Sequence, residues 1–146
     1  MNYKSAIYPG SFYPWHEGHT DILEKAFKIF DEITICRMVN PDKDLGNDKT
    51  IDCTDLFDKL VLNGPFDTGL QIVGHSGLLI DAVNEYHAHA VIRGLRNSTD
   101  FEYEKNLQYN YEDLGLVVPV IYLISDRKLV HVSSSAKRAL KKYNKQ

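Results

Sequence analysis

Short apolar runs alternate with helical patterns five times along the chain, and this alternation constrains the fold more than any other feature. Apolar runs of strand length, such as EITICRMV at residues 32–39, are followed by polar turns and then by segments with helical periodicity, such as residues 20–31. Strands that alternate with helices form a parallel sheet with right-handed crossovers. The sequence therefore predicts a Rossmann-like α/β fold, a five-stranded parallel sheet with helices on both faces.

The expected elements cover most of the chain, which at 146 residues fits a single domain spanning 1–146. The expected strands are residues 5–8, 32–39, 70–73, 90–94 and 117–124. The expected helices are residues 20–31, 53–63 and 78–86, one with a Thr99–Glu102 capping box, and a closing one from about residue 133. Parallel sheets bind ligands at the carboxyl ends of their strands, which points to residues 9–19, 40–50, 74–77, 93–100 and the segment before 133.

Composition and charge exclude several classes of protein. The 17 Lys and Arg residues against 20 Asp and Glu residues give a net charge of −3, which argues against a general nucleic-acid binder. No apolar run is long enough to span a membrane, and the first residues lack the apolar region of a signal peptide. Cys36 and Cys53 form no C-x-x-C motif, so we expect a reducing cytoplasm and no catalytic thiol.

The stretch YPGSFYPWHEGHT, residues 8–20, occupies the first strand-to-helix turn. It contains neither G-x-G-x-x-G nor the P-loop motif, which argues against a nicotinamide dehydrogenase and a P-loop ATPase. Gly10 allows a sharp turn, and His16 and His19 stand where helix N-terminal amides favour anions. The alternatives are a capping histidine beside a surface histidine, or half of a metal site, although no further metal ligands are evident.

The stretch IRGLRNSTDFEYE places Arg93 and Arg96 between a strand and a helix, on the edge where ligands bind. Gly94 between them permits an unusual backbone, and two guanidinium groups suit a substrate with several phosphates. The alternative is that these arginines form surface ion pairs with Asp100 or Glu104.

Two further segments could bind anions. Three serines at a helix start, Ser133, Ser134 and Ser135, precede Arg138 on the same helical face, although simple capping would also explain them. Lys43 lies on the loop after the second strand, where a lysine is usually only solvated. Tyrosines 103, 109 and 111 are interpreted as packing residues. Three anion-binding segments on one sheet edge predict an enzyme or binder of a nucleoside triphosphate without a P-loop.

The motifs YPGSFYPWHEGH, IRGLR, DFEYE and SSSAKR occur in order over nearly the whole chain, and together they resemble the phosphopantetheine adenylyltransferase family. H-x-G-H marks the wider nucleotidyltransferase superfamily, and R-G-L-R followed by F-E-Y-E is more specific. The resemblance implies the reversible reaction of ATP with 4′-phosphopantetheine to give dephospho-coenzyme A and pyrophosphate, with Mg²⁺. It also implies a homo-oligomer, typically a hexamer, while charge and hydropathy lead us to expect neither a nucleic-acid nor a membrane partner.

The resemblance also implies roles for individual residues. His19, Lys43 and Arg96 would be catalytic, with His19 stabilising the transition state at the α-phosphate. Residues implied to bind ATP are Ser11, Phe12, His19, Gly94, Leu95, Arg96, Glu104, Ser133, Ser134 and Ser135, and the positions of His16 and Arg138 add these two to the expected ATP site. Residues implied to hold phosphopantetheine are Ser11, Lys43, Leu79 and Arg93.

The chain departs from the family pattern at Tyr13, His16 and Tyr111, and at Asp44 after Lys43. Histidine at position 16 is more usual in cytidylyltransferases and nicotinamide mononucleotide adenylyltransferases. The alternatives are therefore a sister enzyme acting on nicotinamide mononucleotide or glycerol 3-phosphate, or a non-catalytic nucleotide-binding relative. Arg93 and the DFEYE helix favour phosphopantetheine, and His19 with its cationic partners favours an enzyme.

Overall fold

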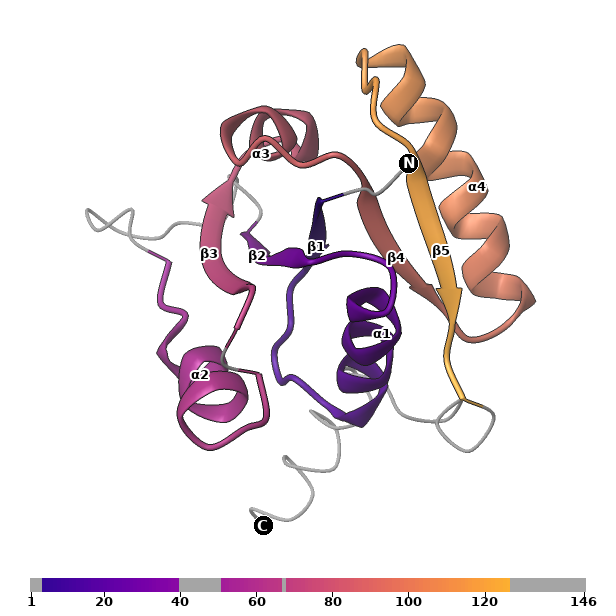
Figure 1. Cartoon of the computed structure of the whole chain (residues 1–146). Coiled ribbons are helices and arrows are strands. Elements are labelled where there is room, and N and C mark those ends of the chain that lie inside the picture. Colours follow the sequence, from indigo (N-terminus) through magenta and orange to yellow (C-terminus); the bar gives the residue numbers. More distant parts are fainter. Residues whose placement is uncertain (1–3, 40–50, 67, 127–146) are drawn as a thin grey trace, which may run out of the picture.

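The computed structural model describes residues 4–39, 51–66 and 68–126, which form one five-stranded sheet (Figure 1). Its strands are β1 (Ser5–Gly10), β2 (Glu32–Val39), β3 (Leu70–Ser76), β4 (Val91–Leu95) and β5 (Val120–Ile124). They lie in the order β3-β2-β1-β4-β5, and every neighbouring pair is parallel. The chain moves outward from β1 to β3 and then returns to β4, so the strand order reverses between β1 and β4. The predicted fold class is confirmed.

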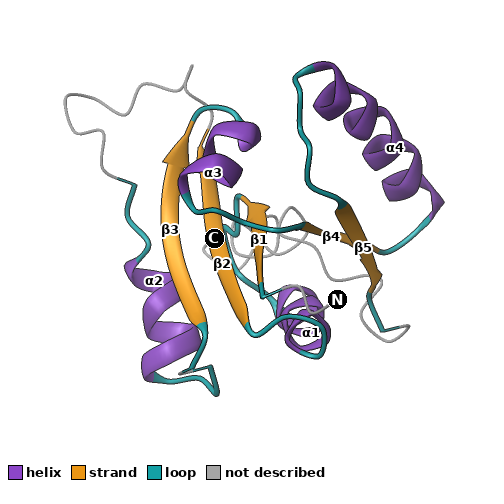
Figure 2. Ribbon diagram, turned by 45° about the horizontal axis from the view of Figure 1, so that its top comes forward, coloured by secondary structure: helices purple, strands orange, loops and turns teal. Residues whose placement is uncertain are grey.

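Helices cover both faces of the sheet (Figure 2). They are α1 (Glu17–Phe27), α2 (Thr54–Phe57), which continues as the π-helix η1 (Asp58–Leu62), α3 (Leu79–Glu85) and α4 (Ser98–Asp113). Side chains of α1, α2 and η1 pack on one face against Tyr8, Ile33, Ile35 and Ile92. Side chains of α3 pack on the other face with Ile7, and Tyr111 of α4 joins that cluster from its edge.

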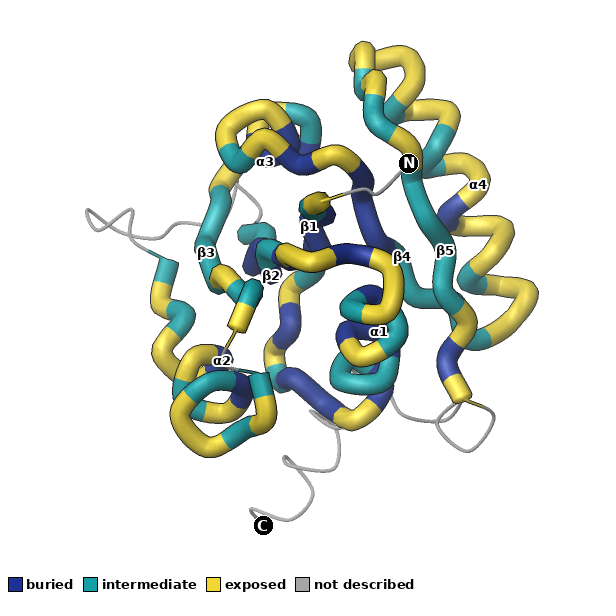
Figure 3. The backbone as a smooth tube through the Cα atoms, in the orientation of Figure 1, coloured by how far each residue is buried: buried dark blue, intermediate teal, exposed yellow. Residues whose placement is uncertain are grey.

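Burial is greatest on the central strand β1, which is dark blue along most of its length in Figure 3, and continues into the middle of β2 and the start of β4. Neighbouring residues of β1 point to opposite faces, so Ala6 and Tyr8 enter one core cluster and Ile7 the other. No helix among the described residues is both long and apolar enough to cross a bilayer. The sheet is therefore covered by amphipathic helices, with its buried centre beside the point where strand order reverses.

Two expected helix starts were wrong. The first helix begins at Glu17 and ends at Phe27, rather than covering residues 20–31, because His16 acts as its N-cap. The fourth helix begins at Ser98, because the side chain of Asn97 accepts a hydrogen bond from the backbone N–H of Asp100 at 2.9 Å. The Thr99–Glu102 capping box does not form the helix start.

The strand boundaries differ less, and in one direction. β1 extends to Gly10 and β3 to Ser76, so residues that were expected to form the turns after these strands belong to the sheet instead. β5 begins only after Pro119, since proline cannot donate a ladder hydrogen bond. The closing helix from residue 133 lies outside the described residues.

Gly94 of β4 lets α1 pack closely on the sheet, and this yields a stability prediction. A Cβ at position 94 would lie 3.0 Å from Cγ1 of Ile22. We expect Gly94→Ala to lower the free energy of unfolding by about 1–3 kcal/mol, measured by urea denaturation, because the core must shift to accept the methyl group. In an Ile22→Ala background the same change should cost close to nothing. An equal cost in both backgrounds would contradict the assigned contact.

Candidate functional site

A cavity of about 360 Å³ opens at the carboxyl ends of β1 and β4, where the strand order reverses. Its walls come from the end of β1, the following turn, the N-terminus of α1, the end of β4 and the first turns of α4. Eight of the residues that the sequence assigns to substrate binding line it: Ser11, Phe12, His16, His19, Arg93, Gly94, Arg96 and Glu104. Open α/β sheets bind ligands at this position, so the cavity is the candidate active site.

The turn after β1 is shaped by a close approach between Gly10 and Phe12. A Cβ on Gly10 would lie 2.8 Å from the Phe12 ring, so only glycine fits there. Phe12 itself has a left-handed backbone, with φ of 50°, and its ring is buried. That ring meets the rings of Tyr8 and His19 edge-to-face, each at a centroid distance of 5.0 Å. Tyr13, the next residue, is exposed and is not part of the cavity wall.

His16 and His19 stack on each other at the start of α1, with ring centroids 3.7 Å apart. The backbone N–H of Gly18 donates to Nδ1 of His16 at 3.1 Å, and the backbone N–H of His16 donates to Nδ1 of His19 at 3.2 Å. Both Nδ1 atoms are therefore acceptors, and in the neutral ring the proton is on Nε2. The capping alternative is thus correct for His16, but His19 is not a surface residue, because it lines the cavity.

Burial lowers the pKa of His19 to about 3, and electrostatic interactions with His16, Arg96 and Lys59 lower it further. His19 is therefore neutral near pH 7. It can offer a phosphate a hydrogen bond from Nε2–H without a net charge. Any attraction between charges must then come from the arginines and lysines of the site.

Arg93 forms a buried ion pair that is also part of the cavity wall. Its Nη2 lies 2.6 Å from Oε1 of Glu104, its Nε donates to both carboxylate oxygens, and its Nη1 donates to the carbonyl of Pro9 at 3.2 Å. Glu104 is only 5% exposed. The ion-pair alternative is therefore correct for Arg93, although the pair is a wall of the cavity and not a surface feature.

Arg96 forms the second pair of the site, with Asp100 one turn along the start of α4. Its Nε donates to Oδ2 of Asp100 at 3.1 Å, and its backbone N–H donates to the same oxygen at 3.0 Å. Both residues line the cavity. Arg93 and Arg96 thus stand on the same cavity with separate carboxylate partners.

Two other residues with implied roles, Leu79 and Leu95, lie apart from the cavity. Leu79, the first residue of α3, is 8% exposed and packs in the core cluster of the opposite sheet face. Leu95 ends β4, where its carbonyl accepts the backbone N–H of Ser125 at 3.0 Å. The packing interpretation holds for Tyr111 but was wrong for Tyr109 and Tyr103, which are exposed; Tyr103 lines the cavity. Lys43, Ser133, Ser134, Ser135 and Arg138 lie outside the described residues.

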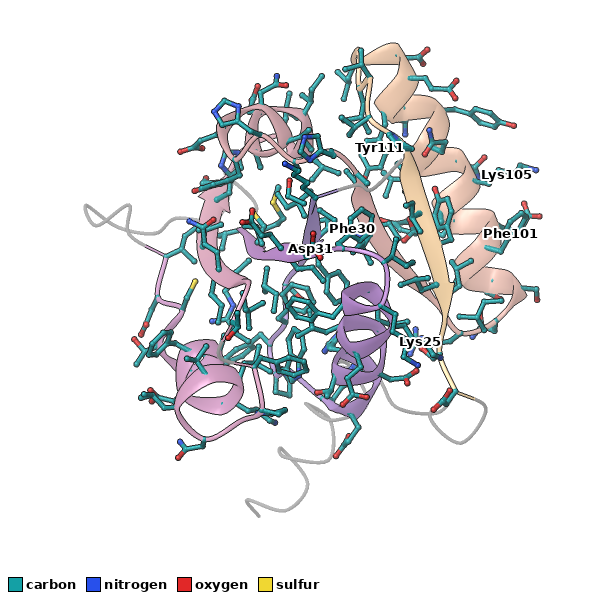
Figure 4. All side chains as sticks on the ribbon, in the orientation of Figure 1. Lys25, Phe30, Asp31, Phe101, Lys105 and Tyr111 are labelled. Atoms are coloured by element: carbon teal, nitrogen blue, oxygen red, sulfur yellow. The ribbon has the colours of Figure 1, made fainter. Side chains whose placement is uncertain are left out.

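Lys25 of α1 binds the end of β5 next to the site, and Figure 4 shows this side chain between the two elements. Its Nζ donates to Asp21, to the carbonyl of Ile124 at 2.6 Å, and to Asp126 at 3.0 Å. The backbone N–H of Asp126 also donates to Asp21. These contacts hold Asp126, where the described chain ends, against α1.

Sequence reasoning missed Arg37, a charged residue within the apolar run of β2. Its side chain is buried and reaches the turn after β1. An arginine in the middle of such a run is itself a signal, because arginine is rarely buried without partners.

The neighbouring Cys36 is fully buried, and burial raises the pKa of its thiol to about 12. A buried thiol with a raised pKa is a poor nucleophile, which agrees with the expectation that Cys36 is not catalytic.

The chain is similar to proteins of one group over almost its whole length. A family model described as Cytidylyltransferase-like matches residues 7–140. The phosphopantetheine adenylyltransferase of Clostridium novyi (strain NT) is 35% identical over 134 residues, which cover 91% of this chain and 80% of that protein. The protein of the same name from Mycoplasma mycoides subsp. mycoides SC is 36% identical over 142 residues, 97% of this chain and 99% of that protein.

Among solved structures, the chain is similar to the pantoate-beta-alanine ligase of Francisella tularensis, in a complex with beta-gamma ATP and beta-alanine. The TM-score is 0.63 at 13% identity, over 93% of this chain and 65% of that one. At this identity the similarity concerns the fold alone.

The environment of His19 leads to a direct titration experiment. We expect its ring nitrogens, followed by NMR in the folded protein, to stay neutral with the proton on Nε2 throughout pH 5–8, because its pKa is about 3. The same residue in urea-unfolded protein should titrate near its usual 6.5. The folded state then binds fewer protons between these values, so this residue's contribution to stability is lost as pH falls from 6.5 towards 3. A folded-state pKa near 6.5 would contradict the burial argument.

Proposed function

The chain belongs to the cytidylyltransferase-like family and, within it, to the phosphopantetheine adenylyltransferases, and we propose that it transfers the adenylyl group of ATP to 4′-phosphopantetheine. The products are dephospho-coenzyme A and pyrophosphate, and the reaction is reversible. One observation carries the proposal beyond family membership: His19, Arg93 and Arg96, from motifs far apart in the sequence, line one cavity at the switch point of the sheet.

The reaction needs positioning and charge stabilisation more than it needs a protein nucleophile. A phosphate oxygen of the acceptor attacks the α-phosphorus of ATP in line, a new P–O bond forms, and the bond to the pyrophosphate oxygen breaks. Negative charge shifts on the α-phosphate oxygens during this step. A hydrogen bond from Nε2 of His19 to one of these oxygens would be strongest in the transition state.

The proposed roles divide the cavity between two substrates. Arg93 binds the phosphate of 4′-phosphopantetheine, Ser11, Lys43 and Leu79 are further proposed contacts of that substrate, and Arg96 binds ATP. The remaining proposed ATP contacts are Ser11, Phe12, His16, His19, Gly94, Leu95 and Glu104, with Ser133, Ser134, Ser135 and Arg138. The ion pair of Glu104 with Arg93 suggests that this carboxylate acts by orienting the arginine.

We propose that Mg²⁺ takes part as a companion of the ATP phosphates. Among the described residues, no three His, Cys, Asp or Glu side chains are placed to hold a metal ion. Mg²⁺ commonly keeps several waters and binds substrate phosphates with few protein ligands, which fits this cavity. When bound, the ion would neutralise part of the triphosphate charge.

His16 is the departure from the family pattern that favours a sister enzyme, but it has a structural role in this chain. It caps α1 through Gly18, so its presence is explained without a different acceptor. The relatives described above carry the name phosphopantetheine adenylyltransferase, which favours that acceptor over nicotinamide mononucleotide or glycerol 3-phosphate.

We further propose a cytoplasmic homo-oligomer, a hexamer by resemblance, in which residues 1–146 act as one nucleotidyltransferase domain. The free thiols Cys36 and Cys53 suit a reducing compartment. Figure 4 shows Phe101 and Lys105 on the side of α4 that faces away from the sheet, and Phe101 is 53% exposed. Aromatic side chains at such positions are typical of subunit contacts, and sedimentation would test the assembly.

Pyrophosphate release tests the proposed function. The protein would be assayed with ATP and CTP, each against 4′-phosphopantetheine, nicotinamide mononucleotide and glycerol 3-phosphate. ATP with 4′-phosphopantetheine should give the highest kcat/KM, and dephospho-coenzyme A should be recovered. A clearly better rate with another pair would refute the assigned acceptor, and no release with any pair would favour a non-catalytic relative.

We expect His19→Ala to reduce kcat by about 10²-fold to 10³-fold while ATP binding largely persists, because the lost hydrogen bond matters most in the transition state. Single-turnover rates and calorimetric titration with ATP would separate the two effects. Turnover close to that of the wild type would remove His19 from the mechanism.

The two arginines should report on different substrates. Replacing either with lysine keeps the charge but removes the planar fork. Arg93→Lys should weaken binding of 4′-phosphopantetheine about tenfold and leave ATP binding nearly unchanged, and Arg96→Lys should do the reverse. Calorimetric titration of each variant with each ligand alone provides the measurement. If both variants lose affinity for the same ligand, the two guanidinium groups share one subsite.

A further inference from the structure

The buried guanidinium group of Arg37 binds both the turn after β1 and the start of α2. Arg37 lies in β2 directly opposite Gly10 of β1, and its side chain is 9% exposed. A guanidinium group has five N–H donors. In this structure they meet five acceptors: the carbonyls of Ser11, Phe12 and Asp52, and both carboxylate oxygens of Asp55.

These contacts join the cavity wall to a rigid anchor. On one side, Nε donates to the carbonyl of Ser11 at 3.0 Å and Nη2 donates to the carbonyl of Phe12 at 2.6 Å. On the other side, Asp55 of α2 accepts from both Nη atoms at 2.7 and 2.8 Å. Ser11 and Phe12 line the cavity, whereas Arg37 does not. With its charge matched by Asp55, Arg37 is a poor candidate for a phosphate ligand.

The geometry of the peptide bond turns these carbonyl contacts into an effect on the cavity. In a planar trans peptide, the C=O and the following N–H point in opposite directions. The carbonyl of Ser11 points to Arg37, so the N–H of Phe12 in the same peptide points away from it. Successive backbone N–H groups near a left-handed residue form anion-binding concavities, and Phe12 is such a residue, with φ of 50°.

A non-glycine residue in this conformation persists only where its surroundings hold it. Gly10 leaves room for the Phe12 ring, and Tyr8 and His19 contact that ring from two sides. Arg37 binds the backbone of the turn at the carbonyls of Ser11 and Phe12. Without it, two carbonyls would lose their donors, and the peptide between Ser11 and Phe12 could rotate.

We propose that Arg37 is a positioning residue for the nucleotide: by binding the carbonyls of Ser11 and Phe12, it directs the amide N–H of Phe12 at the ATP phosphates. The inference rests on the proposed function for the identity of the ligand. It does not depend on which acceptor reacts. The segment from Asp52 to Asp55 then serves as the anchor for a catalytic turn about forty residues earlier in the chain.

The test follows the Phe12 amide itself by NMR of ¹⁵N-labelled protein. In the wild type, the Phe12 amide proton should shift downfield on addition of ATP. Arg37→Lys keeps the positive charge but cannot bind both carbonyls and the carboxylate at once. We expect this variant to bind ATP about tenfold more weakly, with a reduced Phe12 shift, when both proteins are folded.

Val83→Ala is the matched control, because Val83 is buried in the core cluster on the opposite sheet face. It should lower the melting temperature and leave the ATP affinity and the Phe12 shift within twofold of the wild type. Equal loss of ATP affinity in both variants would reduce Arg37 to a stability role and overturn the proposal.

The wild-type measurement keeps the proposal falsifiable even if Arg37→Lys does not fold. A Phe12 amide that does not respond to saturating ATP would overturn it directly. If ATP shifts this amide but no dephospho-coenzyme A forms with 4′-phosphopantetheine, the proposed function fails and the positioning role of Arg37 stands. The two inferences can therefore fail separately.

Discussion

Phe12 has a left-handed backbone and a ring that is 2% exposed, and this combination sets the geometry of the whole site. The ring reaches the core only because Gly10 has no side chain in its path. Its edge-to-face contact with His19 fixes the plane of the imidazole, and the backbone N–H of His16 fixes which nitrogen carries the proton. A turn of a few residues thereby decides both the position and the tautomer of the central histidine.

The electrostatics of the cavity follow from this arrangement. His19 is neutral because burial and neighbouring cations depress its pKa, so it contributes a hydrogen bond and no charge. Arg93 and Arg96 bring the positive charge, and each is held by a carboxylate, Glu104 or Asp100. Each ion pair fixes the direction of its guanidinium group and reduces the net positive charge of the cavity. Preorganised donors of this kind suit a reaction in which charge shifts between phosphate oxygens.

Much of the fold could be predicted from the sequence, because apolar runs bounded by Gly, Pro and polar turns specify strands locally. The helix starts could not, for two different reasons. Histidine is not among the usual N-cap residues, so a capping histidine was only an alternative and the helix start was placed at residue 20 instead of directly after His16. At α4, three successive residues can all serve as caps, and the side chain of Asn97 prevails.

The site was predictable to the extent that its residues occur in motifs. The turn after β1 and the IRGLR segment meet at one cavity, as their positions at strand ends indicated. Arg37 was missed because its partners are distant in sequence: Asp55 belongs to an ordinary helix start, and Ser11 and Phe12 offer only backbone carbonyls. Leu79, which the resemblance assigns to the substrate, instead packs in the core cluster of the opposite sheet face, so its burial could not be read from the motif. Tertiary partners of these kinds leave little trace in a single sequence.

The central claim is that one cavity, at the switch point between β1 and β4, binds both ATP and 4′-phosphopantetheine. A crystal structure with dephospho-coenzyme A tests it most directly, because this product joins the adenylyl group to the acceptor. We predict that the phosphate bound to adenosine lies within hydrogen-bonding distance of Nε2 of His19 and of the Phe12 amide, and that the second phosphate lies by Arg93. A product bound outside this cavity, or with its phosphates away from His19, would contradict the account.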